Sequence, residues 1–291
     1  MLKGQIVYII FFIFLSAYSF SYGNKKINLH YNLNKPDKII KLPKPLHEIS
    51  GLSVVDNQNL ACIQDEKGII YTYNLQEERI THEAWFGEDG DYEGLALVGN
   101  TMYVLRSDGV LFEVENYTSA QSKTKQYPTR ILATNNEGLF YDKDKNRLLI
   151  ASKSNERKGA QYKDRRAVWS FDIKTKMTDP KPVYEFNIQK INSFIAQNSI
   201  SFFSKNKITK IKFRPSDIAI HPFSKNIFIL SAVDYSLFIF DNDGTLKHIE
   251  PLDPKLFRQA EGIAFMSDGT LYISNEGQDK HPTLLIFNYI Q

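Results

Sequence analysis

The sequence predicts an all-β protein of the β-propeller class, because one short phrase returns five times and each copy precedes the same succession of strand-like runs. The copies are Ile49–Ser53, Tyr92–Ala96, Asn136–Phe140, Ser216–Ile220 and Ala260–Ala264. Their equivalent positions are Gly51, Gly94, Gly138, Asp217 and Gly262, which lie 43, 44, 79 and 45 residues apart. A period of about 40 to 45 residues in strand-rich units is typical of propeller blades.

Each phrase starts a first strand, and two further runs follow it. Second strands are expected at Leu60–Ile63, Met102–Leu105, Leu148–Ala151, Ile227–Leu230 and Leu271–Ser274. Third strands are expected at Ile69–Tyr73, Val110–Val114, Ala167–Phe171, Leu237–Phe240 and Leu284–Phe287. These runs are short, rich in β-branched and aromatic residues and bounded by Gly, Asp and Asn, which favours strands joined by hairpins.

Fourth strands precede the next phrase, at Ile80–Phe86, Lys125–Ile131, Val183–Ile188 and Thr245–Ile249. No such segment follows the last run, but Lys38–Leu42 precedes the first phrase. We expect this segment to pair with the last blade and close the ring, which removes exposed strand edges.

The 79-residue interval is long enough to contain a sixth blade. No further phrase occurs between Asn187 and Lys212, and Ile191–Phe203 has the mixed apolar spacing of a helical or looped insertion. The sequence therefore predicts five blades with an insertion near residues 189–212, and six blades is the alternative.

Composition favours one domain. A chain of 291 residues with 42% hydrophobic residues can fill a large core, and propellers of this length are often single domains. We assign residues 24–36 to a linker and 37–291 to the propeller. The net charge of +3 is small and its basic residues are scattered, which argues against a nucleic-acid partner. The single cysteine, Cys62, lies in an apolar strand and is expected to be a buried thiol.

The first 23 residues have the order of a secretory signal: Lys3, the apolar run Ile6–Leu15, then small and polar residues. Because a membrane span needs about 20 apolar residues, this run is short for one. We expect a periplasmic or secreted protein. The alternative is an uncleaved signal that tethers the protein to the inner membrane, facing the periplasm.

The candidate site is a ring at one mouth of the central channel. The first strand of a blade lines the channel and the second runs antiparallel to it, so the start of one and the end of the other share a face. The residues before the Gly position are Ser50, Glu93, Glu137, Ser216 and Glu261. The ends of second strands add further polar residues, among them Asp65, Glu66, Asp108, Asn275 and Glu276.

Converging carboxylates must either take up protons or gain a cation. For an exported protein, an oxygen-rich cluster favours Ca²⁺ over zinc, which prefers His or Cys. The six histidines fall at unequal places in the repeat and form no ligand spacing. The competing interpretation is structural: a Glu at this position would hydrogen-bond the backbone of the neighbouring blade.

Basic residues lie beside the acidic ring. Arg106 and Lys153 end second strands, and together with a bound cation they would hold an anion. The alternative is a solvated loop. The sequence contains no nucleophile elbow, phosphate-binding loop or Ser-His-Asp order that would indicate catalysis.

The phrases Glu48–Ser53, Asp91–Ala96, Arg214–Pro222 and Glu261–Phe265 followed by Leu271–Gly277, taken in order, resemble the SdiA-regulated family, also called the YjiK family. The resemblance runs from about residue 37 to residue 291. It implies an exported or membrane-tethered bacterial propeller linked to calcium, with a fold similar to that of β-propeller phytases. By motif match, the calcium suggestion transfers to Glu93, Glu137 and Glu261, and further to Asn275 and Glu276. Ser50 and Ser216 hold the same repeat position without a carboxylate.

We therefore expect a non-enzymatic module that binds calcium at the channel mouth and presents that face to a protein or small-molecule partner. The alternative is a calcium-dependent hydrolase, either a phytase-like phosphoesterase or a lactonase. In that hypothesis Glu93 or Glu137 is the base and Arg106 or Lys153 holds the anion. A third alternative is an interaction scaffold with structural glutamates.

Overall fold

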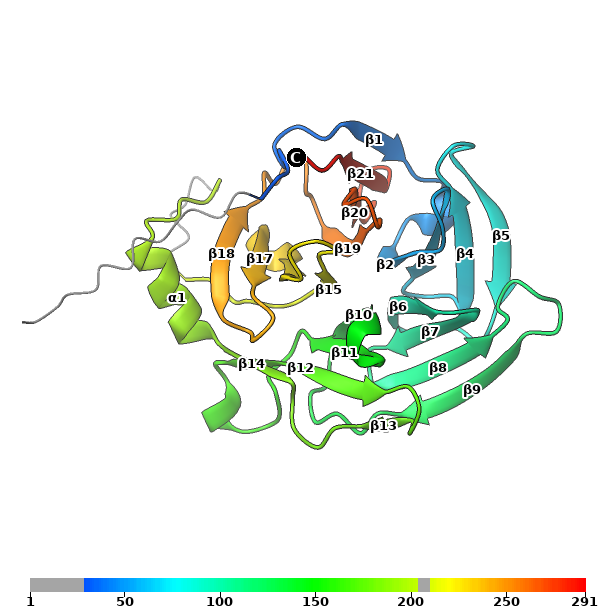
Figure 1. Ribbon diagram of the computed structural model, residues 1–291, viewed down its shortest axis with the longest axis horizontal. Helices are drawn as coiled ribbons and strands as arrows, with labels where there is room; N and C mark the ends of the chain where they lie inside the picture. Colours follow the sequence, from blue (N-terminus) through cyan, green and yellow to red (C-terminus); the bar gives the residue numbers. More distant parts are fainter. Residues whose placement is uncertain (1–28, 204–209) are drawn as a thin grey trace, which may run out of the picture.

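Five antiparallel sheets surround a common centre in the computed structural model, which describes residues 29–203 and 210–291 (Figure 1). The first strand of each sheet lies nearest the centre and contacts the first strands of the two adjacent sheets. These strands are β2 (Ile49–Val54), β6 (Tyr92–Val98), β10 (Asn136–Asp142), β15 (Asp217–Ile220) and β19 (Ala260–Phe265). The predicted propeller is confirmed, with five blades rather than six.

The second and third strands fall where the apolar runs predict them. The second strands are β3 (Asn59–Gln64), β7 (Thr101–Arg106), β11 (Arg147–Ser152), β16 (Ile227–Ser231) and β20 (Leu271–Asn275). The third strands are β4 (Ile69–Asn74), β8 (Val110–Glu115), β12 (Arg165–Asp172), β17 (Ser236–Phe240) and β21 (Thr283–Phe287).

The outer strands complete the blades. They are β5 (Arg79–Trp85), β9 (Lys123–Pro128), β18 (Leu246–Pro251) and β1 (Lys38–Lys41). In blade 3 the outer strand is split into β13 (Met177–Thr178) and β14 (Tyr184–Asn187), which pair with opposite ends of β12.

The ring closes as predicted. Strand β1 pairs antiparallel with β21, with Lys38 opposite Ile286 and Lys41 opposite Thr283. Figure 1 shows the two strands side by side although they come from opposite ends of the propeller. The last blade thereby obtains its fourth strand from the beginning of the domain, which ties the first and last blades together.

The hydrophobic core consists of five clusters, each between two neighbouring blades. Between blades 1 and 2, for example, Ile63 packs with Tyr92 and Phe112. Cys62 is a free, buried thiol between blades 5 and 1, as expected, and burial raises its pKa above the usual range. Because each cluster joins two blades, the blades depend on one another for burial.

The insertion between blades 3 and 4 contains the helix α1 (Ile188–Gln197), which lies outside the ring in Figure 1. The side chain of Asn187 caps it by accepting hydrogen bonds from the backbone N–H groups of Gln189 and Lys190. In the described ranges, four single 3₁₀ turns occur in the loops: η1 (Lys44–Leu46), η2 (Lys143–Lys145), η3 (Ala160–Tyr162) and η4 (Ala232–Asp234).

The expected signal peptide, residues 1–23, lies outside the described residues. In the described part of the expected linker, Tyr31 and Leu33 are buried against blades 4 and 5. The Tyr31 hydroxyl donates to the carbonyl of Gly269 at 2.5 Å and lies 2.9 Å from His221 Nε2. The packed domain therefore begins before residue 37. Within the described ranges, no helix has the length and apolar character needed to cross a membrane.

Candidate functional site at the channel mouth

A β-bulge recurs at the start of the first strand in four blades. The register between first and second strands shifts around Ser50, Glu93, Glu137 and Glu261, so each is the extra residue of its strand. A bulge removes one residue from the ladder and redirects its side chain. This geometry turns the repeated polar residue toward the channel mouth instead of into the blade.

The glycine after the bulge is required by close approach of the neighbouring blade. A Cβ added at Gly94 would lie 2.7 Å from the carbonyl oxygen of Glu137, and one at Gly138 would lie 2.9 Å from the backbone nitrogen of Ile218. Those distances are too short for a side chain. The Glu-Gly pair therefore does two things: the Glu places a carboxyl group at the channel mouth, and the Gly lets the first strands of neighbouring blades approach closely.

The bulged residues surround a small cavity of about 180 Å³ at the channel mouth. Six acidic side chains and one lysine line it, together with Ile49, Ser50 and Gln259. The charged set is Glu48, Asp65, Glu93, Glu137, Glu261, Glu276 and Lys153. The fold thus brings four of the predicted site residues to one cavity: Glu93, Glu137, Glu261 and Glu276.

One part of the cavity has its own cation. The Lys153 ammonium lies 2.9 Å from Glu137 Oε2, and Glu137 is only 3% exposed. Burial lowers the pKa of Lys153, but the carboxylates of Glu137 and Glu261 outweigh burial and raise it. Lys153 therefore stays charged and acts as a counter-ion for the surrounding glutamates.

The glutamates around Lys153 differ in protonation. Burial and the neighbouring Glu137 raise the pKa of Glu93 to about 9. Burial also raises the pKa of Glu261 to about 8, even though Lys153 opposes the rise. At neutral pH, Glu93 and Glu261 hold protons while Glu137 pairs with the ammonium, so this part of the cavity carries little net charge.

The other part of the cavity is acidic. Burial and Glu48 raise the pKa of Glu276, and His47 and Lys153 oppose that rise without forming an ion pair with it among the described residues. Glu48, Asp65 and Glu276 form none of the ion pairs found among the described residues. Burial and the adjacent Glu48 and Glu276 raise the pKa of Asp65 to about 6. Its Oδ1 atom is buried without a hydrogen-bond partner among the described residues. We call these three residues the acidic subsite.

Three other predicted site residues do not line the cavity. Asn275 is fully buried, and its amide donates to Leu256 O and Thr283 Oγ1 at 3.1 and 3.0 Å. Arg106 binds Asp108 through two nitrogens and lies over the ring of Phe112. Ser216 is also buried and belongs to an interblade contact.

The two serines of the ring bind the next blade. Ser50 Oγ donates to the carbonyl of Tyr92 at 2.7 Å, and Ser216 Oγ donates to the carbonyl of Ala260 at 2.9 Å. Both acceptors precede a bulged glutamate. The hydrogen bond to the neighbouring backbone, which the structural interpretation assigned to the glutamates, is thus made by the serines.

Replacing each serine by alanine is expected to cost about 1 kcal/mol of unfolding free energy, because a buried carbonyl loses its donor. The double variant should lose about 2 kcal/mol, since the sites are in separate blades. Urea unfolding measures this, with the exposed Ser119→Ala as control. A double variant as stable as the parent would show that the hydroxyls do not join blades.

Stability should decrease as pH rises. The folded-state pKa values of Glu93 and Glu261 exceed the ordinary 4.5, so the folded protein binds more protons than the unfolded chain. Their stabilising contribution is complete below about pH 4.5 and is lost as pH rises through about 8 to 9. We compare the unfolding free energy of Glu261→Gln with that of the parent at each pH. This difference should be about 1–3 kcal/mol more favourable to the variant at pH 9 than at pH 5. An unchanged pH profile in thermal unfolding would contradict these protonation states.

Glu48 and Gln259 are cavity residues that sequence reasoning did not select. Both lie two residues before a bulge position, as Asp91 does in blade 2. The repeat could have identified them, because an alignment of the blades places these polar residues at one common position, two residues before the bulge.

Fold and site define a five-bladed β-propeller with an acidic channel mouth. The chain matches no protein-family model and no curated protein. Among solved structures, it is similar to a Myxococcus xanthus glutaminyl cyclase, with TM-score 0.53 and 12% identity over 87% of this chain and 95% of that one. A chain of a nidogen/laminin complex gives TM-score 0.51 and 14% identity over 80% and 74%. A streptogramin B lyase gives TM-score 0.46 and 14% identity over 81% of this chain, which spans 65% of that lyase chain. At such identities the likeness shows the fold alone.

Proposed function

We propose that the protein is an exported propeller of the SdiA-regulated, or YjiK-like, type that binds a cation at its channel mouth and presents this face to a partner. The observation that supports it is the acidic subsite, where Glu48, Asp65 and Glu276 share a small cavity and repel one another. A cation relieves this repulsion, whereas the three glutamates around Lys153 already have an internal ammonium.

Calcium is the proposed cation. The donor types suit it, because every polar donor of the subsite is a carboxyl oxygen and Asp65 Oδ1 is buried without a partner. The side chains as they lie do not form a finished site: no group of three or more His, Cys, Asp or Glu in the described residues is placed to hold a metal ion. Binding would therefore require the subsite side chains to move toward the ion.

Thermal unfolding with and without Ca²⁺ tests the proposal. A site with the 10⁻⁴–10⁻³ M affinity typical of extracellular calcium modules would add about 1.5–3 kcal/mol at 10 mM Ca²⁺. Tm would rise by about 3–10 °C. Asp65→Asn with Glu276→Gln should abolish the rise, while Glu66→Gln, an exposed neighbour outside the cavity, should retain it. An equal rise in all variants would place calcium elsewhere, and no rise would remove calcium from the proposal.

A hydrolase is the second candidate, and one arrangement favours it. The cavity combines a paired carboxylate, Glu137, with the protonated Glu93 and the ammonium of Lys153, which are the groups of acid-base chemistry on an anionic substrate. Arg106 does not line the cavity, so Lys153 alone would hold the anion. Turnover of phosphomonoesters or lactones with Ca²⁺ present, lost in Glu137→Gln, would support this candidate. Absence of turnover would argue against the hydrolase and in favour of the cation-binding module proposed above.

A further inference from the structure

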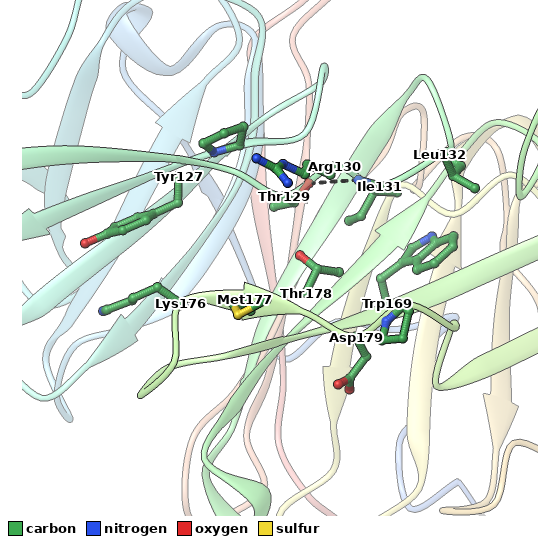
Figure 2. Close-up of a pocket in the computed structure, with 12 residues that line it drawn as sticks. Tyr127, Thr129, Arg130, Ile131, Leu132, Trp169, Lys176, Met177, Thr178 and Asp179 are labelled. Carbon is green, nitrogen blue, oxygen red and sulfur yellow. Dashed lines mark hydrogen bonds between the residues drawn. The ribbon is translucent and has the colours of Figure 1, made fainter.

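A second, larger cavity of about 500 Å³ lies between blades 2 and 3 (Figure 2) and shares no lining residue with the channel-mouth cavity. Its walls are two runs of chain, residues 127–132 at the end of β9 and residues 176–180 around β13. Trp169 of β12 lies between the two runs in Figure 2. We call this cavity the interblade groove. Its volume is that of small-molecule sites.

The groove exists because the outer strand of blade 3 is interrupted. Strand β13 pairs with Phe171 and Asp172, and β14 pairs with residues 165–168, so no strand residue pairs with Trp169 from the outside. The connecting chain contains Pro180 and Pro182, which cannot donate to a ladder. At the interruption Asp179 and Pro180, which belong to no strand, line the groove together with Trp169.

Two polar atoms of the groove are buried without hydrogen-bond partners among the described residues: Trp169 Nε1 and Thr178 Oγ1. Trp169 is only 2% exposed. A buried donor without a partner costs about 1–3 kcal/mol, so the groove gains free energy from an acceptor that reaches the indole N–H. Leu132 and Met177 are 52% and 67% exposed and give the groove an apolar, solvent-exposed wall.

The charges around the groove favour an anion. Arg130 lies in its wall, and an adjoining cavity of about 600 Å³ shares Ile131 and Leu132 with it. That cavity adds Lys158 and also Arg157, which is already paired with Glu156 at 2.6 Å. The acids of both linings are Asp179 and Asp108, and Asp108 is already paired with Arg106. Lys176 is also committed, since its ammonium contacts Glu113.

We propose that the interblade groove binds a small organic carboxylate with an aliphatic body. The apolar chain lies over Leu132 and Met177, and the carboxylate accepts from the indole N–H of Trp169 with Arg130 supplying the opposite charge. This site is independent of the cation site at the channel mouth.

Tryptophan emission tests the proposal directly. The sequence has two tryptophans, so Trp85→Phe, at an exposed position, leaves Trp169 as the single reporter. Titration of the full chain with decanoate should give a saturable change in emission. Decanol, which lacks the charge, and decyltrimethylammonium, which reverses it, should bind at least about tenfold more weakly. Arg130→Gln should weaken decanoate about threefold to tenfold, whereas the exposed Lys123→Gln on β9 should not.

Calorimetry with Trp169→Phe isolates the indole N–H, because Phe keeps an aromatic ring but removes the donor. The expected loss is about threefold to tenfold in decanoate affinity, corresponding to one net hydrogen bond of about 1 kcal/mol. Circular dichroism confirms that the variant is folded. Absence of saturable binding, or equal binding of all three amphiphiles, would overturn the proposal.

Discussion

Replacing Lys153 by Met should destabilise the protein by about 3 kcal/mol at pH 8, one of the largest effects of any single change outside the core. The reason is that Glu137, 3% exposed, loses the ammonium 2.9 Å away and becomes an unpaired buried charge. At pH 5 the loss should be smaller, because burial already raises the pKa of Glu137 and of Glu93 and protons can replace the cation. Chemical denaturation at the two pH values measures the difference.

The design includes two controls. Lys145→Met removes an exposed lysine from the same blade and should change stability by less than about 0.5 kcal/mol. The double variant Lys153→Met with Glu137→Gln should recover most of the loss, since both charges are absent. If Lys153→Met loses the same free energy of unfolding relative to the parent at pH 8 and at pH 5, Lys153 is not the counter-ion of the ring.

Replacing Asp217 by Ala should lower the unfolding free energy by about 2–4 kcal/mol, because its carboxyl group joins two blades. The other four blades have Gly at this repeat position. Asp217 Oδ2 accepts from the backbone N–H of Ile263 in blade 5 at 2.8 Å, and Oδ1 accepts from Ile218 at 2.8 Å. Burial raises the pKa of Asp217 well above the usual range, while these N–H donors act against the rise. Loss of the side chain leaves buried donors without acceptors.

Asp217→Asn is the matched comparison, because it keeps one carbonyl oxygen and the shape of the side chain. We expect it to lose about half as much stability as the alanine variant, measured by urea unfolding. An alanine variant within 1 kcal/mol of the parent would mean that Asp217 is only a divergent repeat residue.

The sequence predicts the propeller well because each blade repeats the same local pattern. Alternation of apolar residues, Gly-Asp turns and a fixed period are properties of neighbouring residues, so they locate nearly every strand. The split of the outer strand in blade 3 was not predicted, although Pro180 and Pro182 mark a place where a regular strand cannot continue.

The site was predicted in part. The repeat position of Glu93, Glu137 and Glu261 is sufficient to place them on one face, because the fold converts a repeat into a ring. The ion pair does not recur in the other blades. Lys153 directly follows β11 and contacts Glu137 of the paired strand β10, and only the structure shows that its ammonium is a counter-ion. The interblade groove was not predictable from local pattern, since Trp169, Arg130 and Met177 come from different strands and loops.

Calorimetric titration of Ca²⁺ into the chelator-treated full chain at pH 7 tests the central claim most directly, with the Asp65→Asn, Glu276→Gln double variant and the Glu66→Gln variant measured in parallel. We predict one saturable site in the parent and in Glu66→Gln and none in the double variant, because no carboxyl group of the acidic subsite forms an ion pair within the described part of the chain. Binding that survives in the double variant, or no binding in the parent, would contradict a calcium site at the channel mouth.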